Sequence, residues 1–223
     1  MHIGLIGGIG PAATEHYYRG LIERYGRSGA RLELTIVHAD VRELARNVAG
    51  MERQKQAEVF AALVRRLAGA GAELAAVTSM GGHFCIAELE PLSPLPLIDT
   101  IPEVKTALRE RGLKTIGILG TKLVMETGLY GGISSATIVV PEGEALERVH
   151  QSYIAMAQAG RVAEDQRQTF FAAGEWMHQE RGAEAVLLGG TDLFLAFEGR
   201  NCGFPLIDCA AIHMDAICRR ALD

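Results

Sequence analysis

The sequence has few aromatic residues and no long apolar run. Phe, Trp and Tyr make up only 6% of the 223 residues, whereas 48% are hydrophobic and 22% are charged. This is a normal mixture for a protein with a buried core. The low aromatic content and the many alanine and glycine residues favour helices packed closely on a sheet over a β-sandwich. No stretch approaches the ~18 consecutive apolar residues that cross a bilayer, so we expect no membrane partner.

Basic residues are fewer than acidic ones, 22 against 27. The formal net charge is −5 and the isoelectric point is near 5.8. Nucleic acids select basic surfaces, so these values argue against a nucleic-acid partner. The chain also starts without the basic segment and cleavage site of a secretory signal, and we therefore expect a cytoplasmic protein.

The cysteines lack the spacing of a metal site. Cys85, Cys202, Cys209 and Cys218 form no C-x-x-C pair. In a reducing compartment they are predicted to be free thiols, and no metal is expected. The simplest interpretation of Cys85 and Cys209 is that each is a small buried hydrophobic residue.

Three segments recur in the same order along the chain. IGLIGG at residues 3–8 returns as IGILGT at 116–121, GAELAAVTSM at 71–80 as GAEAVLLGGT at 182–191, and PLIDT at 96–100 as PLIDC at 205–209. The offset stays at about 110 residues throughout, which predicts a tandem duplication.

Each repeat pairs apolar runs with helical patterns. Runs that are fully apolar and do not alternate are typical of parallel strands covered on both faces. Residues 52–67 have the spacing of an amphipathic helix. The sequence therefore predicts an α/β protein with two pseudo-symmetric Rossmann-like domains, parallel sheets and an active-site cleft between them. The expected domains are 1–99 plus 208–223, and 100–207.

The glycine-rich segment GGIGPAAT at residues 7–14 follows the first predicted strand. Pro11 and Ala12 occupy the end of the turn, so it is not a usable G-x-G-x-x-G motif, and no Lys-Ser or Lys-Thr of a phosphate loop follows. A tight turn at a helix N-terminus suits a small anion better. A substrate carboxylate bound near Gly8, Ile9 and Gly10 would fit such a turn.

Motifs along most of the chain resemble one enzyme family. Gly7–Pro11 with Ala13-Thr14 and Tyr17-Tyr18, Gly120-Thr121 with Met125-Glu126, and Asp208 with Ala210–His213 are similar to the opening, middle and closing motifs of aspartate/glutamate racemases that work without pyridoxal phosphate. The resemblance implies two related domains, a homodimer, no cofactor, and a small carboxylate or amino acid as substrate.

The same resemblance implies a mechanism that this sequence does not retain. In the family, each half carries a cysteine, and the thiol pair exchanges proton roles across the α-carbon. Here the first cysteine position falls on Thr78 or Ser79, and the second falls on Gly190. Two-thiol racemisation is therefore not available.

Other side chains near the predicted strand ends become candidates for the lost roles. His83 and His213 are candidates for acid/base work because imidazole titrates near neutral pH. The hydroxyl groups of Thr78, Ser79, Thr121 and Thr191 could bind a carboxylate. Asp192, which stands where the family has glutamate, and His213 are also candidates for binding the substrate. Either histidine could instead be a structural residue.

Three functions follow from these residues. The first is an isomerase of the amino-acid racemase type in which Thr78 or Ser79, His83 and Gly190 stand at the catalytic positions. The second is a lyase or decarboxylase-type enzyme on the same fold that uses one-sided proton transfer. The third is a non-catalytic protein that binds a small acid.

Overall fold

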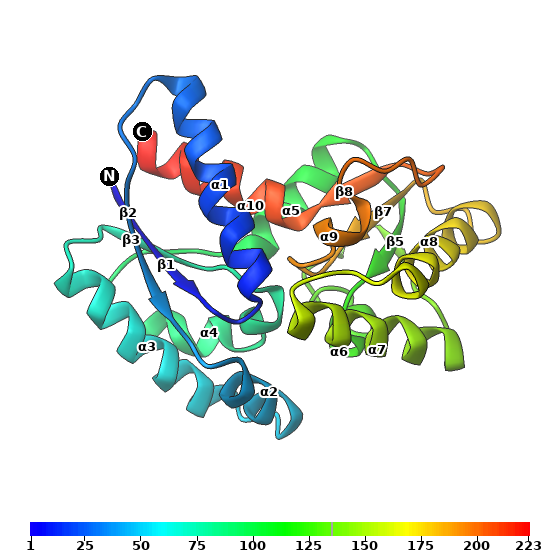
Figure 1. The fold of residues 1–223 in the computed structure, drawn as a ribbon, viewed down its shortest axis with the longest axis horizontal. Helices are drawn as coiled ribbons and strands as arrows, with labels where there is room; N and C mark the ends of the chain where they lie inside the picture. Colours follow the sequence, from blue (N-terminus) through cyan, green and yellow to red (C-terminus); the bar gives the residue numbers. More distant parts are fainter. Residues whose placement is uncertain (135) are drawn as a thin grey trace. The chain divides into compact units, whose positions relative to one another are not determined.

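The computed structural model describes residues 1–134 and 136–223 and contains two separate four-stranded sheets (Figure 1). The chain divides into two compact units, one made of Met1–Thr100 with Ala210–Asp223 and the other of Ile101–Cys209. The domains expected from the sequence stay a prediction, because a compact unit is not by itself an independently folding domain.

The sheet of the first unit has the order β2-β1-β3-β4, and all of its pairings are parallel. Its elements, in chain order, are β1 (His2–Gly7), α1 (Pro11–Ser28), β2 (Glu33–His38), α2 (Val41–Ala49), α3 (Arg53–Gly69), β3 (Leu74–Val77), the 3-10 turns η1 (Met80–Cys85) and η2 (Glu90–Leu92) with α4 (Ile86–Leu89) between them, β4 (Leu97–Ile98), and the last helix α10 (Cys209–Leu222).

The sheet of the second unit has the order β6-β5-β7-β8 and is again parallel throughout. Its elements are α5 (Thr100–Glu110), β5 (Thr115–Leu119), α6 (Lys122–Glu126), β6 (Thr137–Val139), α7 (Gly143–Ala159), α8 (Glu164–Gln179), β7 (Ala185–Leu188), α9 (Phe194–Phe197) and β8 (Leu206–Asp208). The two sheets thus share one strand order, in which the first strand of each half lies between the second and the third.

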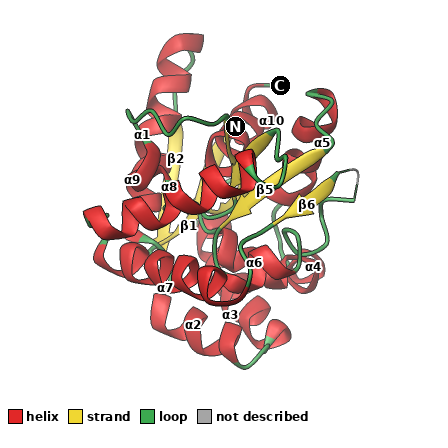
Figure 2. Cartoon of the chain, turned by 90° about the vertical axis from the view of Figure 1, so that its right-hand side faces the viewer, coloured by secondary structure: helices red, strands yellow, loops and turns green. Residues whose placement is uncertain are grey.

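The predicted α/β class with parallel sheets is confirmed. The central strands β3 and β7 are buried along their whole length, and helices flank the strands (Figure 2). Helix α3 corresponds to the predicted segment 52–67, beginning one residue later and ending two residues later. Its buried face is formed by Phe60, Leu63, Val64 and Leu67, while Val59 is only partly buried. No described helix combines the length and the apolar content that a membrane span requires.

Helix α10 completes the core of the first unit. Met214 and Ile217 of α10 belong to one buried cluster with Leu5 of β1 and with Tyr17 and Leu21 of α1. The N-terminal amine also donates a hydrogen bond to the backbone oxygen of Ala221, 3.0 Å away, and both chain ends lie in this unit (Figure 1). Residues more than 190 positions apart, such as Leu21 and Met214, therefore share one core.

Ile217→Ala tests the contribution of α10. Ile217 is fully buried, so removing its side chain beyond Cβ is expected to lower the free energy of unfolding by about 2–5 kcal/mol. Urea unfolding followed by circular dichroism measures the loss. Leu222→Ala in the same helix is the matched control, because Leu222 is 45% exposed. Equal losses in the two variants would contradict a core role for α10.

Candidate functional site

The third strand of each sheet ends in the same backbone arrangement. Ile6 pairs with Val77 in the first sheet, and Leu119 pairs with Leu188 in the second. The next amide donates to the neighbouring strand in both: Thr78 N–H to Ile6 O at 3.0 Å, and Gly189 N–H to Leu119 O at 2.8 Å. Two residues past each strand, the chain therefore reaches Ser79 in one unit and Gly190 in the other.

The turn that follows is also shared. The amide of Gly82 donates to Ser79 O at 3.1 Å, and the amide of Leu193 donates to Gly190 O at 3.0 Å. Ser79 and Gly190 thus occupy corresponding positions in the two units. The correspondence comes from hydrogen bonds alone, whereas the duplication that would explain it stays a prediction.

Thr78 is part of a network that braces the glycine-rich turn. Its hydroxyl donates to Ile6 O at 3.1 Å and lies 3.4 Å from Thr14 Oγ1. Thr14 Oγ1 in turn accepts the Gly8 amide at 2.9 Å and donates to Gly10 O at 3.1 Å. The Gly8 amide expected to meet an anion therefore already has a protein acceptor. Gly8 and Gly10 have φ angles of 88° and 105°, which favour glycine.

Ser79 differs from Thr78 in what its hydroxyl does. Ser79 precedes the turn η1, but its side chain makes no capping hydrogen bond to that turn. The residue is 6% exposed and has an extended backbone, with φ −140° and ψ 126°. Of the two candidates at this strand end, Thr78 serves the fold and Ser79 has the hydroxyl that is not tied to the adjacent backbone.

His83 is held by the backbone on both sides of its ring. Its Nδ1 lies 2.8 Å from Ser79 O, which can only accept, so Nδ1 carries the proton. Its Nε2 accepts the amide of Thr100 at 3.3 Å and lies 3.8 Å from the carboxylate of Asp99. Burial lowers the pKa of His83, although Asp99 opposes this shift. Both ring nitrogens are therefore engaged, and the ring is hydrogen-bonded to the backbone oxygen of Ser79. A catalytic role for His83 stays a prediction.

His213 lies beside His83 and is equally enclosed. Its Nε2 donates to Ile98 O at 2.8 Å, which leaves Nδ1 to accept the hydroxyl of Tyr17 at 2.9 Å. The two imidazole rings lie edge to face, with centroids 5.7 Å apart. Burial, aided by the proximity of His83, lowers the pKa of His213 to about 3. His213 is therefore neutral at physiological pH and ties α10 to the end of β4.

At the second strand end, a side chain from another element fills the space above Gly190. A Cβ atom on Gly190 would lie 2.3 Å from Cε2 of Tyr153 and 2.7 Å from its hydroxyl oxygen. Tyr153 is contributed by α7 and is 5% exposed. Tyr153 was not predicted as a site residue, because nothing in the pattern of residues 143–159 distinguishes it from an ordinary core position.

Asp192 and Thr191 complete this strand end, and each is 2% exposed. The Tyr153 hydroxyl donates to Asp192 Oδ2 across 3.4 Å. Thr191 Oγ1 is buried and has no hydrogen-bond partner among the described residues. A buried hydroxyl without a partner costs about 1–3 kcal/mol. A ligand atom that accepts a hydrogen bond from the Thr191 hydroxyl would remove this cost.

The remaining predicted residues have structural contacts. Thr121 caps α6, its Oγ1 accepting the amide of Val124 at 3.3 Å. Ile9 is 3% exposed. Cys85 is buried, and burial raises the pKa of its thiol to about 12, so it is not a thiolate at neutral pH. Within residues 1–134 and 136–223, no three His, Cys, Asp or Glu side chains are grouped as metal ligands.

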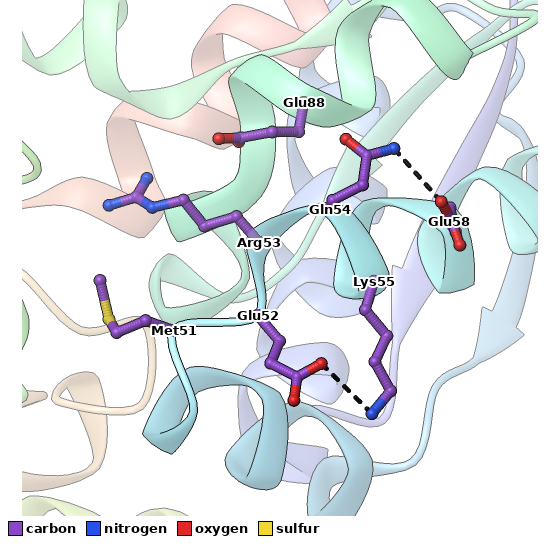
Figure 3. A pocket seen from close by; sticks show the side chains of 7 residues that line it. All are labelled: Met51, Glu52, Arg53, Gln54, Lys55, Glu58 and Glu88. Carbon is purple, nitrogen blue, oxygen red and sulfur yellow. Dashed lines mark hydrogen bonds and ion pairs between the residues drawn. The ribbon is translucent and has the colours of Figure 1, made fainter.

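Two surface pockets lie away from the strand ends. One of about 510 Å³ is lined by Met51, Glu52, Arg53, Gln54, Lys55, Glu58 and Glu88 (Figure 3). Glu52 pairs with Lys55 at 3.4 Å, and Gln54 donates to Glu58 at 3.3 Å. The other, of about 500 Å³, lies along α7 and α8 and includes Trp176. Neither pocket contains a residue predicted from the sequence to bind substrate.

Comparison with known proteins places the whole chain in one structural group. The sequence model of the family described as Asp/Glu/Hydantoin racemase matches residues 6–217. An Asp/Glu racemase candidate from Yersinia pestis is 25% identical, with all of both chains covered and a TM-score of 0.82. An aspartate racemase homologue from Pyrococcus horikoshii is 26% identical over 100% of this chain and 99% of its own, with a TM-score of 0.78.

A more distant relative has been solved with a ligand. Glutamate racemase from Francisella tularensis, in complex with D-glutamate, is 14% identical and has a TM-score of 0.71. The match covers 99% of this chain and 81% of that protein. At this identity, the likeness bears on the fold alone.

The buried neutral histidines predict a loss of stability in acid. The pKa of His213 is about 3 in the folded protein and near 6.5 when unfolded, so the unfolded state binds more protons between these values. Stability is therefore expected to fall as the pH drops below 6.5, by about 1.4 kcal/mol per pH unit for this residue. Burial of His83 acts in the same direction.

Urea unfolding at pH 7 and pH 5 measures this dependence. His213→Gln, which cannot titrate, is expected to be less stable at pH 7 but to lose about 2 kcal/mol less than the native protein between the two pH values. A variant with the native pH dependence would show that His213 is not the titrating group.

Proposed function

The chain belongs to the Asp/Glu/hydantoin racemase family, and from this premise we propose that it acts at the α-carbon of a small amino acid or related carboxylate. The family match spans nearly the full length, and relatives described as racemases share the fold over the whole chain. Racemases are isomerases, so the proposed activity is of the amino-acid racemase type.

The observation that carries this proposal is the unpartnered hydroxyl of Thr191. It is buried at the end of β7, one residue after Gly190, where a parallel sheet commonly binds its ligand. A carboxylate accepts hydrogen bonds strongly, and a hydrogen bond to a charged group contributes about 1.5–3 kcal/mol. Thr191 is therefore our candidate for holding a substrate carboxylate.

Ser79 is our candidate for the corresponding position of the first unit. Its hydroxyl is not used for capping, and His83 fixes the backbone oxygen of the same residue. Thr78, by contrast, uses its hydroxyl to brace the glycine-rich turn. Ser79 cannot act as a thiolate, so the chemistry proposed here is not the two-thiol exchange.

The difference between the two strand ends favours one alternative. Ser79 offers a hydroxyl, whereas Gly190 has no side chain and faces the Tyr153–Asp192 pair. Unequal groups suit proton transfer at one face of a carbanion, as in a lyase or decarboxylase-type reaction, better than a symmetric exchange. The cofactor-independent mechanism, the homodimer and the cytoplasmic location stay predictions.

Exchange of the α-hydrogen tests the proposal directly. The purified protein is incubated in D₂O with L- and D-aspartate and L- and D-glutamate, and α-deuteration is followed by ¹H NMR. We expect exchange with at least one of the four, since inversion and elimination by a lyase both begin with loss of the α-proton. A decarboxylase would instead break the bond to a carboxyl group and leave deuterium in its place. Saturable binding without exchange would instead indicate a non-catalytic binder. If the protein neither binds these amino acids nor exchanges their α-hydrogen, amino-acid racemase activity on these substrates is excluded.

Thr191→Val tests the carboxylate contact. Valine keeps the shape but removes the hydroxyl, so KM or Kd for the substrate is expected to rise about 10- to 100-fold. Because the unpartnered hydroxyl is also removed, stability without ligand should not fall. Thr137→Val, at an exposed position of β6, is the matched control. An unchanged affinity in Thr191→Val would remove Thr191 from the site.

A further inference from the structure

The aromatic ring of Tyr153 occupies the place that a side chain at Gly190 would take. A Cβ atom there would be only 2.3 Å from the ring and 2.7 Å from the hydroxyl oxygen, closer than Cβ atoms approach other atoms. Glycine is therefore required at position 190 while the ring is in place. A phenol from α7 stands where the corresponding strand end of the first unit has the side chain of Ser79.

The hydroxyl of Tyr153 is coupled to a buried carboxylate. It donates to Asp192 Oδ2 at 3.4 Å and also accepts a hydrogen bond from the Asp192 amide. Tyr153 and Asp192 are 5% and 2% exposed. Burial, followed by the charge of Asp192, raises the pKa of Tyr153 well above its ordinary value. At neutral pH the phenol therefore holds its proton and points it at the carboxylate.

We propose that the Tyr153 hydroxyl, paired with Asp192, is the proton-transfer group of the second unit. This inference rests on the proposed function, because it takes Gly190 and Thr191 as neighbours of the substrate. Helix α7 then supplies the proton-transfer group that Gly190, which has no side chain, cannot supply. The aromatic ring alone would be enough to fill the space beside Gly190. The hydroxyl of Tyr153 and the carboxylate of Asp192 add a path along which a proton can move.

The step balances without any co-reactant. The α C–H bond of the substrate breaks, its electron pair stays on the carbon and is delocalised into the substrate carboxylate. The proton joins Tyr153 Oη, while the proton of the phenol passes to Asp192 Oδ2. In the reverse direction, Asp192 returns a proton to the phenol and the phenol delivers its own to the carbon. In D₂O, deuterium reaches the α-carbon once the Tyr153 hydroxyl and the Asp192 carboxyl have both exchanged their protons with solvent before the carbon is reprotonated.

Tyr153→Phe is the central test, since it keeps the ring and removes only the hydroxyl. Positioned acid/base groups typically contribute 10²–10⁴-fold, so α-hydrogen exchange of aspartate or glutamate is expected to slow at least 100-fold. Binding of the same amino acid, measured by isothermal titration calorimetry, should stay within about threefold. Tyr25→Phe is the matched control, because Tyr25 is also buried and its hydroxyl has no partner among the described residues.

Asp192→Asn provides a second variant if Tyr153→Phe does not fold. It preserves size but cannot accept the relayed proton, and exchange is expected to slow at least tenfold with the melting temperature retained. Native exchange rates in either folded variant would overturn the role of the pair and leave the proposed function intact. Saturable binding by the native protein without exchange would also overturn it. If the native protein neither binds nor exchanges these substrates, the proposed function fails with it.

Discussion

Every strand pairing in the described residues is parallel, and this constraint governs the rest of the structure. Successive parallel strands need a crossover connection, which is why helices separate most of them and why they flank both sheets. The central strands are then covered on both faces and become uniformly apolar. As a consequence, β3 ends beside the carboxyl end of β1, and β7 ends in the same way beside the carboxyl end of β5.

The side chains at the two corresponding strand ends come from different parts of the chain. In the first unit, a local side chain remains at position 79, and the nearby histidine is locked to the backbone as a neutral support. In the second unit, the local side chain is absent, and α7 supplies both bulk and a hydroxyl. Gly190 and Tyr153 are 37 positions apart in sequence, yet the ring of Tyr153 occupies the space that a side chain at position 190 would fill.

Much of the fold could be predicted because its signals are local. Apolar runs marked the strands, amphipathic spacing marked α3, and the recurring segments indicated two similar sheets. The family was recognised from motifs and is confirmed by the family match. The strand-end position of Gly190 also followed from counting along the repeat.

The contents of the site were less predictable, since they depend on contacts between distant elements. Tyr153 lies in an unremarkable helical stretch, and only the folded backbone brings its ring to Gly190. His83 and His213 were predicted to act as titratable groups. Burial keeps both rings neutral, and each donates a hydrogen bond to a backbone oxygen, of Ser79 and Ile98 respectively. Likewise, the choice between Thr78 and Ser79 depended on a hydrogen bond to Ile6, which sequence spacing does not reveal.

The closure of the first unit by α10 also affects the order in which the chain can fold during synthesis. Its core needs Met214 and Ile217, which emerge from the ribosome after the whole of the second unit. The segment Ile101–Cys209 has all of its own strands available before the last helix is made. The surface of the first unit that α10 covers therefore stays exposed until α10 has been synthesised. Chains generally fold from the N-terminal part first during synthesis, whereas here the residues of the second unit are all synthesised before those that complete the first.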